Sequence, residues 1–333
     1  MTKHESILKT HWERYRDHFT IDKPILNKII QPYSSDEVAS FTLLSEGCAN
    51  SNYKIEFVTG QFVVLRIYLR EKDSLAREIA LHQLVADQLP VPEIFYSDDS
   101  CALIDHPYAI MEFVDGELMR SVILSKDETA IRECAFSAGI NLNHLRNIKL
   151  EHGGFFQDGN LTIRPFNHDE EYLPYAYSCL DHENVIDSLG KQRAKLLRSF
   201  LEQNQHFLPN ESNANLTHAD YDPANMLVKK IKNRFEVVAL LDWEFAFSGS
   251  YLLDIGMFLR YSHKLPETYE SSFVNGIISE GSALPEYWKK SAKLMDIICL
   301  LSLLYWNPKK DRPNLSADVA SLIQNTLDNW HLF

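Results

Sequence analysis

Two short apolar runs, each bordered by a polar residue of a particular kind, constrain the fold of this chain more than any other feature. The first run, 226–228, directly follows Asn225, and the second run, 237–241, is directly followed by Asp242. The link at 229–234 is polar, so the two runs predict a β-hairpin. Residues at the open end of a hairpin are neighbours, and Asn225 and Asp242 are therefore expected to lie side by side.

A third polar residue connects this hairpin with the chemistry of phosphoryl transfer. Asp220 stands five residues before Asn225, which is the spacing that kinases use between the carboxylate beside the acceptor hydroxyl and a Mg²⁺ ligand. Asn225 and Asp242 would be the metal ligands, because Mg²⁺ prefers oxygen atoms. Each residue alone is equally explained as a turn or cap residue. Their combination favours a Mg²⁺-dependent site with Asp220 as the catalytic residue.

The stretch resembles the aminoglycoside phosphotransferase and choline kinase group. The signature of that group is His-Gly-Asp, four variable residues and Asn, followed by an apolar strand that ends in Ile-Asp-Trp or Ile-Asp-Phe. His218, Asp220, Asn225 and Asp242 occupy the matching positions, and Ala219 replaces the glycine. The resemblance implies that Asp220 is catalytic and that His218 stabilises the catalytic loop. A packed, hydrogen-bonded histidine explains His218 equally well.

Two further acidic residues near the signature are interpreted as structural. Asp222 stands where the group often has histidine. It can assist substrate binding or hold the loop, and the loop role is favoured. Asp254, at the start of an apolar segment, also matches the pattern of the group, and the resemblance implies that it supports the catalytic loop.

The resemblance implies an α+β, two-lobed protein-kinase-like fold, and 333 residues are enough for both lobes. A small nucleotide-binding lobe with an antiparallel β-sheet is expected over 1–114, and a larger, mainly helical lobe with the catalytic loop and the acceptor pocket over 115–333. Residues 1–35 are expected to be a helical extension. Apolar residues at helical spacing over 4–31 predict one or two amphipathic helices that pack on the small lobe; these residues are Ile7, Leu8, Trp12, Tyr15 and Phe19.

Apolar runs at 41–44, 53–58 and 62–68 predict three strands of the small lobe. The loop between the first two strands has small polar residues, which let backbone N–H groups approach phosphates. It resembles the Gly-Gly-x-x-Asn-x-x-Tyr loop of the group, with Glu46 in place of the first glycine. The residues of this loop that are expected to bind nucleotide are Gly47, Asn50, Ser51 and Asn52.

A buried ion pair is predicted next to the phosphates. Arg66 lies in the third strand, where the kinase pattern has the cation that holds the α- and β-phosphates. A buried guanidinium needs a carboxylate partner, and Glu78 stands among apolar residues of the predicted helix 74–89. The alternative pairs Glu78 with Arg77 or Lys72 at the surface. The order of loop, arginine and glutamate along the chain favours the buried pair.

The strand predicted at 108–114 resembles the kinase hinge between the lobes. By that resemblance Met111 lies behind the adenine, and the backbone from Glu112 to Val114 binds its edge. An alternating core strand explains Met111 as well, and the two interpretations are compatible. The rest of the chain is expected to be helical apart from the catalytic hairpin.

The acceptor pocket is expected to form from the inserted segments at 167–187 and 265–306. The first segment is acidic and aromatic, and Asp169, Glu170 and Glu171 are candidates for substrate contact. Charged helix faces are more often simply solvated, so both interpretations stay open for these three residues.

Composition limits the partners. The formal charge of −13 argues against a nucleic-acid partner, which needs a basic surface; it suits a cationic substrate, although ordinary solubility explains it too. Five scattered cysteines without a paired motif predict reduced thiols, and the histidines have no zinc spacing. The longest apolar run, 297–306, is too short to cross a bilayer. The expected location is the cytoplasm.

The sequence therefore predicts a phosphotransferase that uses ATP or GTP with Mg²⁺ and transfers the γ-phosphate to a hydroxyl of a small molecule. An aminoglycoside-like or other cationic acceptor is favoured, and both antibiotic resistance and metabolism stay open as its role. A kinase of choline, ethanolamine, homoserine or another small metabolite is the first alternative. A catalytically idle, kinase-like binding protein is the second.

Overall fold

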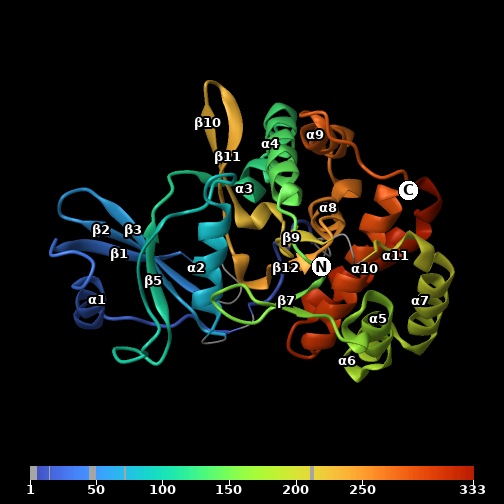
Figure 1. Ribbon diagram of the computed structural model, residues 1–333, viewed down its shortest axis with the longest axis horizontal. Coiled ribbons are helices and arrows are strands. Elements are labelled where there is room, and N and C mark those ends of the chain that lie inside the picture. The colour runs from blue at the N-terminus through green and yellow to red at the C-terminus, as the bar shows by residue number, and fades with distance from the viewer. Residues whose placement is uncertain (1–5, 15, 45–49, 71–72, 211–213) are drawn as a thin grey trace, which may run out of the picture.

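The structure is a computed structural model that describes residues 6–14, 16–44, 50–70, 73–210 and 214–333. It has two lobes, a smaller one built around a sheet and a larger one built mainly from helices (Figure 1). The chain passes from the first lobe to the second at 113–116, between strand β5 (Tyr108–Glu112) and strand β6 (Glu117–Leu118), which pairs with the catalytic hairpin. The α+β, protein-kinase-like architecture expected from the sequence is therefore present.

The small lobe contains an antiparallel sheet with the strand order β1-β2-β3-β5-β4. Alternating side chains of β2 are buried on one face, where α1 covers the sheet, whereas Leu75 of α2 packs with Met111 on another side. The remaining elements are β1 (Val38–Leu44), β2 (Ser51–Phe57), β3 (Phe62–Ile67), β4 (Ile94–Asp98), α1 (Lys23–Ile30) and α2 (Ser74–Val85).

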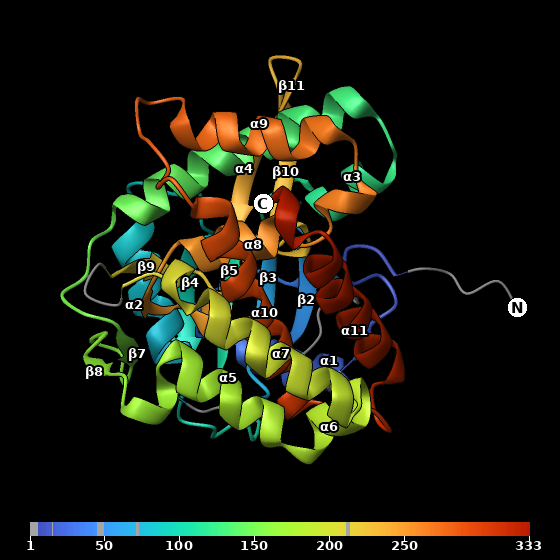
Figure 2. The same cartoon turned by 90° about the vertical axis from the view of Figure 1, so that its right-hand side faces the viewer.

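Helices α4 and α9 form a closely packed pair along one edge of the large lobe (Figures 1 and 2). Helices α4 and α9 cross so closely that a Cβ atom at Gly139 or at Gly276 would clash with the backbone of the opposite helix. The helices of this lobe are α3 (Met119–Leu124), α4 (Glu128–Asn147), α5 (Tyr172–Asp181), α6 (Glu183–Leu189), α7 (Lys191–Asn204), α8 (Leu252–Phe258), α9 (Glu267–Ile278), α10 (Trp288–Trp306) and α11 (Pro313–Asp328). No helix in the described part of the chain is both long and apolar enough to cross a membrane.

The predicted hairpin is formed by β10 (Met226–Ile231) and β11 (Arg234–Leu240), with Met226 opposite Leu240. Both strands extend further into the polar link than the apolar runs indicate. The turn at Lys232 and Asn233 has φ angles of 49° and 67°, the left-handed pair that a two-residue hairpin turn requires.

A second small sheet corrects the expectation that only the hairpin would be extended in this lobe. Four three-residue strands pair in the order β8-β7-β12-β9. Strands this short give no detectable period in the sequence, and their pairing is non-local. They are β7 (Gly154–Phe156), β8 (Ile163–Pro165), β9 (Asn215–Thr217) and β12 (Phe247–Gly249).

The N-terminal residues also differ from the prediction. Among the described residues before Asp36, only Lys23–Ile30 is helical. Leu8 and Lys9 both have left-handed φ angles, 50° and 62°, which an α-helix does not allow. The apolar residues of this segment are divided between the lobes, because Leu8 packs in the core of the large lobe and Phe19 packs on the small one. The segment crosses beside α11 of the large lobe (Figure 2).

Candidate active site

The catalytic loop connects β9 with β10, and Asp254 of α8 stabilises it through hydrogen bonds to its backbone. The two carboxylate oxygens of Asp254, which is fully buried, accept the backbone N–H groups of His218 and Ala219, each at 2.8 Å. Ala219 has a left-handed φ of 62°. This backbone conformation explains why glycine is usual at the position, since a Cβ atom makes it less favourable.

His218 connects the loop to the end of β11. Its Nε2 atom lies 3.0 Å from the Leu241 carbonyl oxygen and therefore carries the proton, whereas its Nδ1 atom accepts the Asp220 N–H at 3.3 Å. Burial lowers the pKa of His218 to about 4, so the ring is neutral at pH 7. Its ring also packs at 4.5 Å from the Trp243 ring. These contacts give His218 a positioning role in the loop.

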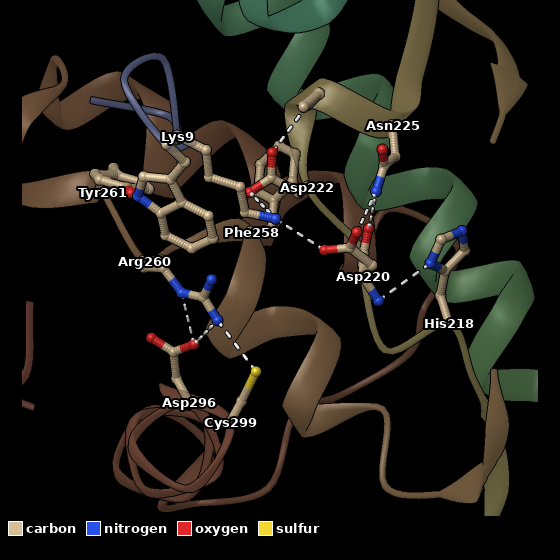
Figure 3. A network of polar contacts seen from close by, with 12 residues as sticks. Lys9, His218, Asp220, Asp222, Asn225, Phe258, Arg260, Tyr261, Asp296 and Cys299 are labelled. Carbon is tan, nitrogen blue, oxygen red and sulfur yellow. Dashed lines mark hydrogen bonds and ion pairs between the residues drawn. The ribbon is translucent and has the colours of Figure 1, made fainter. Parts of the chain in front are cut away.

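Asp220 is oriented by a donor on each of its carboxylate oxygens (Figure 3). Asn225 donates from Nδ2 to Oδ2 at 2.7 Å and to the Asp220 carbonyl at 2.9 Å. Lys9 donates from Nζ to Oδ1 at 2.8 Å. Burial alone would raise the pKa of Asp220, but the Lys9 charge and these hydrogen bonds lower it below the ordinary value. The carboxylate is therefore ionised at neutral pH.

Asp222 forms the N-terminal cap of the short 3₁₀ helix Pro223–Asn225. Its Oδ1 atom accepts the Ala224 N–H at 2.9 Å, and its side chain is almost completely buried. This geometry gives Asp222 the loop-holding contact that the sequence favours. Its Oδ2 atom lies 3.3 Å from Lys9 Nζ, which is a contact that the sequence did not indicate.

Asn225 and Asp242 are neighbours at the open end of the hairpin. The Leu241 N–H donates to the Asn225 carbonyl at 2.8 Å, and Asp242 follows directly. Because Nδ2 of Asn225 faces Asp220, its Oδ1 atom points away from that carboxylate (Figure 3). Asp242 remains partly exposed and has a left-handed φ of 65°. One amide oxygen and one carboxylate are hard ligands of the kind that suits Mg²⁺, so this pair fits such an ion.

Arg66 joins the two lobes at this point. Its Nη2 atom lies 2.5 Å from Asp242 Oδ1 and 3.4 Å from Glu78 Oε2. Glu78 is 1% exposed, so it pairs inward with Arg66 and not at the surface with Arg77; Lys72 lies outside the described residues. Burial alone would lower the pKa of Arg66, but Glu78 and Asp242 raise it well above its ordinary value. A fixed positive charge therefore lies beside Asp242.

The loop between β1 and β2 is described only in part, and Gly47 lies outside the described residues. The Asn50 side chain accepts the Leu69 N–H at 3.2 Å and donates to Glu244 at 3.3 Å, while the Ser51 hydroxyl accepts the Phe19 N–H at 2.8 Å. Both side chains are buried and engaged with protein. Contacts of Asn50 and Ser51 with a nucleotide would thus have to come from their backbone.

The segment between the lobes offers fewer free backbone groups than expected. Met111 is buried with Leu75. The Glu112 N–H donates to the Glu93 carbonyl at 2.8 Å, so this group is not available to a base. Val114 lies beyond the end of β5, which makes it the better placed of the proposed hinge residues.

Comparison with known proteins shows the family and the fold of this chain. A family model described as the phosphotransferase enzyme family matches residues 40–287. The chain belongs to this family. Its fold is also that of a solved GDP and kanamycin complex of APH(2″)-IIIa, with a TM-score of 0.68 and 16% identity over 92% of this chain and 99% of that one. No curated protein matches the sequence.

Two further solved structures show the same fold. One is described as a GDP complex of a mutant aminoglycoside 2′-phosphotransferase-IIIa, with a TM-score of 0.67 and 17% identity over 93% of this chain and 99% of that one. The other is a thermostable mutant of APH(4)-Ia in a ternary complex with ADP and hygromycin B, with a TM-score of 0.63 and 16% identity over 90% and 97%. The protein is therefore a phosphotransferase with the protein-kinase-like fold.

Two charged residues of this phosphotransferase were given no role at the sequence level, Lys9 and Glu244. Lys9 contacts Asp220 across a separation of 211 positions, so no local spacing could reveal it. Glu244 lies 3.6 Å from Arg70 of the small lobe and accepts Asn50 Nδ2. The signal for Glu244 was its place directly after the Asp242-Trp243 pair, where it links the nucleotide-loop side of the small lobe to the hairpin.

The acidic segment before α5 contributes less to a substrate site than its charge suggests. Glu170 forms two hydrogen bonds, at 2.7 and 2.8 Å, with the Arg164 guanidinium and caps its own turn. Glu171 lies 3.5 Å from His168, and both are largely exposed. Asp169 is also exposed. Glu170 is therefore a structural residue, whereas Asp169 and Glu171 lie in solvent.

Proposed function

We propose that this phosphotransferase moves the γ-phosphoryl group of ATP or GTP to a hydroxyl group of a small molecule. The observation that carries the proposal is the position of Asp220, an ionised and partly exposed carboxylate with Asn225 on one of its oxygens. Asn225 in turn lies beside Asp242, which contacts Arg66. The proposed base and the two proposed metal ligands thus lie together in one stretch of the chain, and Arg66 of β3 brings the proposed phosphate-binding cation to them.

In the proposed reaction Asp220 accepts a hydrogen bond from the acceptor hydroxyl and takes its proton as the oxygen attacks. The new bond joins the acceptor oxygen to the γ-phosphorus, the bond from that phosphorus to the β,γ-bridging oxygen breaks, and the nucleoside diphosphate leaves. Asn225 and His218 keep Asp220 in place during this step. Arg66 stabilises the phosphate charge, and Glu78 orients Arg66.

Asn225 and Asp242 would hold Mg²⁺. When bound, this ion supplies neutralisation of the phosphate oxygens as charge shifts to the leaving group. The protein contributes the placement of the ligands, because the hairpin register and the Leu241 hydrogen bond hold the backbone at the two residues together.

The nucleotide is proposed on the basis of Arg66, the loop around Asn50 to Asn52 and the segment ending at Val114. The solved structures of the same fold include complexes described with GDP and with ADP. Both bases fit a hinge that binds through backbone atoms, and competition between ATP and GTP for one labelled nucleotide decides the preference.

An aminoglycoside-like or other cationic molecule is the proposed acceptor. The charge of −13 supports it, as do the kanamycin and hygromycin B named for structures of the same fold. Kinases of choline, ethanolamine, homoserine and other metabolites share the proposed chemistry and are the alternatives. A role in antibiotic resistance and a cytoplasmic location stay predictions from the sequence. The idle-binding alternative is disfavoured, because a binding protein has no need of Asp220 beside two metal ligands.

The test is Mg²⁺-dependent turnover of ATP and GTP with a panel of aminoglycosides, amino alcohols, amino acids, sugars and macrolides. The Asp220→Ala variant is the control. Turnover that one compound class stimulates in the wild type, and not in the variant, supports the proposal and names the class. A protein that neither binds Mg²⁺-nucleotide in a thermal-shift assay nor hydrolyses it contradicts the proposal.

A further inference from the structure

The described part of the N-terminal segment is fixed to the large lobe. We call residues 6–14 and 16–19 the N-terminal strap. Leu8 is 1% exposed in the core of the large lobe. The Trp12 indole donates to Asp318 of α11 at 2.8 Å, and the Glu13 carboxylate accepts the Asn314 N–H, also at 2.8 Å. These contacts combine an apolar anchor with two polar contacts that follow it along the chain.

The same strap then reaches the small lobe. The Arg14 guanidinium donates to the Asn50 carbonyl at 2.8 Å, and the Phe19 N–H donates to Ser51 Oγ at 2.8 Å. Asn50 and Ser51 belong to the proposed nucleotide loop. Along the chain, the strap therefore contacts the catalytic loop at Lys9, then α11 of the large lobe at Trp12 and Glu13, and then the proposed nucleotide loop of the small lobe.

Lys9 is the residue of the strap that enters the active site (Figure 3). Its Nζ atom lies 2.8 Å from Asp220 and 3.3 Å from Asp222, and its side chain is 12% exposed. Leu8 and Lys9 both have left-handed φ angles, a conformation that costs about 1 kcal/mol for a residue with a Cβ atom. Such backbone strain persists only where the surroundings hold it, and the buried Leu8 side chain supplies that hold.

The charges around Lys9 explain why an ammonium is needed there. Asp222 is buried, and among the described residues no hydrogen bond reaches its Oδ2 atom, so Lys9 is the cation that compensates it. Arg260 also acts on Lys9 as a nearby cation, and it is already paired with Asp296 at 2.6 Å. Burial alone would lower the pKa of Lys9, but Asp220 and Asp222 raise it above its ordinary value. Lys9 is therefore charged.

We propose that Lys9 is a positioning residue for phosphoryl transfer and that the N-terminal strap is a wall of the acceptor site. The inference rests on the proposed function of Asp220. With Lys9 on Oδ1 and Asn225 on Oδ2, the carboxylate cannot rotate without losing a hydrogen bond, and it meets the acceptor hydroxyl in one orientation. Lys9 also occupies the space next to Asp220, which limits the groups that an acceptor can carry beside its reactive hydroxyl.

An alternative is that Lys9 imitates a cationic acceptor and must leave before catalysis. The other contacts of the strap argue against this alternative, because those of Leu8, Trp12 and Glu13 would have to be released together with that of Lys9. The two hypotheses predict opposite changes in turnover when the Lys9 charge is removed.

The decisive variants are Lys9→Met, which keeps the length of the side chain without its charge, and Lys9→Arg, which keeps the charge. Lys264→Met is the matched control, because Lys264 donates to the Ser6 carbonyl at 2.9 Å and so contacts the strap away from the carboxylates. Steady-state turnover of Mg²⁺-ATP and Mg²⁺-GTP is measured with kanamycin, hygromycin B and choline, and also without acceptor.

In Lys9→Met we expect kcat to fall about 100-fold, the cost of a misplaced reacting group, while KM for nucleotide stays within about 2-fold, because Lys9 contacts no proposed nucleotide residue. Lys9→Arg should recover part of kcat, and Lys264→Met should resemble the wild type. Higher turnover in Lys9→Met would overturn the proposal in favour of a displaceable plug, and unchanged turnover would reduce the contact to a structural ion pair.

A labelling experiment tests the contact without any acceptor. Reductive methylation with formaldehyde and borohydride, read residue by residue by mass spectrometry, should modify Lys9 at least about 10-fold more slowly than the exposed Lys191, since an ammonium in a buried ion pair is rarely deprotonated. Asp220→Asn should remove much of this protection. Labelling of Lys9 at the rate of Lys191 in the wild type would overturn the inference. Absent nucleotide binding with Lys9 protected would instead contradict the proposed function.

Discussion

The catalytic hairpin and the N-terminal strap meet at Asp220 but are specified differently. The hairpin with its loop brings Asp220, Asn225 and Asp242 together within one continuous stretch of chain, through a two-residue turn and backbone pairing. The strap brings Lys9 to the same carboxylate from 211 positions away. Its place depends on the Leu8 side chain, which packs in the core of the large lobe. The first region therefore depends mainly on local geometry, and the second on the packed lobes.

The largest expected effect is at the residue where the two regions meet. Asp220→Ala should lower phosphotransfer by at least about 10³-fold, since general-base catalysis contributes factors of about 10² to 10⁴ and the Lys9 and Asn225 contacts lose their partner as well. The affinity for nucleotide, measured by fluorescence titration, should change little. Turnover close to that of the wild type would contradict the catalytic role of Asp220, and with it the roles proposed for the hairpin and the strap.

The strap should lose its packing on the large lobe when the Leu8 side chain is shortened. Leu8→Ala removes a fully buried side chain and should lower the free energy of unfolding by about 3 kcal/mol, within the range for large-to-small core substitutions. Turnover should fall too, because Lys9 loses its support. The comparison is with Leu196→Ala, at an exposed position of α7, and urea denaturation gives both values. Equal stability of the two variants would show that the strap is not packed as described.

The loop that precedes the hairpin should show a pH dependence of stability through His218. The unfolded chain binds a proton near pH 6.5, whereas the folded pKa is about 4. Stability is therefore complete above pH 6.5 and falls as the pH decreases toward 4, by at most roughly 3 kcal/mol at 1.36 kcal/mol per pKa unit. Urea denaturation from pH 4 to 7.5 measures it, with His218→Gln as the reference that lacks the titration. Parallel curves for the two proteins would contradict a buried neutral histidine.

The smallest effect separates backbone strain from packing in the catalytic loop. Ala219→Gly should raise the free energy of unfolding by up to about 1 kcal/mol, because glycine adopts the left-handed φ of 62° without a Cβ penalty. Ala224→Gly, in the 3₁₀ helix of the same loop, should lower it by a similar amount. Thermal unfolding of the pair is the measurement, and loss of stability in both variants would refute the strain.

The sequence predicted the site where its parts follow one another along the chain. The hairpin, the adjacency of Asn225 and Asp242 and the inward Arg66–Glu78 pair all have counterparts in the structure. Turn chemistry and strand alternation are local, so they can be recognised without the fold. The roles proposed for these residues await the experiments above.

The prediction of helix was confirmed for Lys23–Ile30 but was wrong for the described residues before it, for a physical reason. Helical spacing of Leu8, Trp12 and Phe19 indicated an apolar helix face, but Leu8 and Trp12 pack against the core of the large lobe and Phe19 packs against that of the small lobe. A periodic pattern reports that residues are buried, and it does not report against which partner. The left-handed backbone at Leu8 and Lys9 follows from packing in the assembled fold.

By itself, the sequence determined the elements whose hydrogen bonds and turns lie within a few residues of each other, and with them the composition of the catalytic loop. Only the tertiary structure decided which charge faces Asp220, because a contact between Lys9 and the catalytic loop exists only when the strap is packed on the large lobe. Buried charges need partners wherever the fold can supply them, and the chain order gives no hint of where that is.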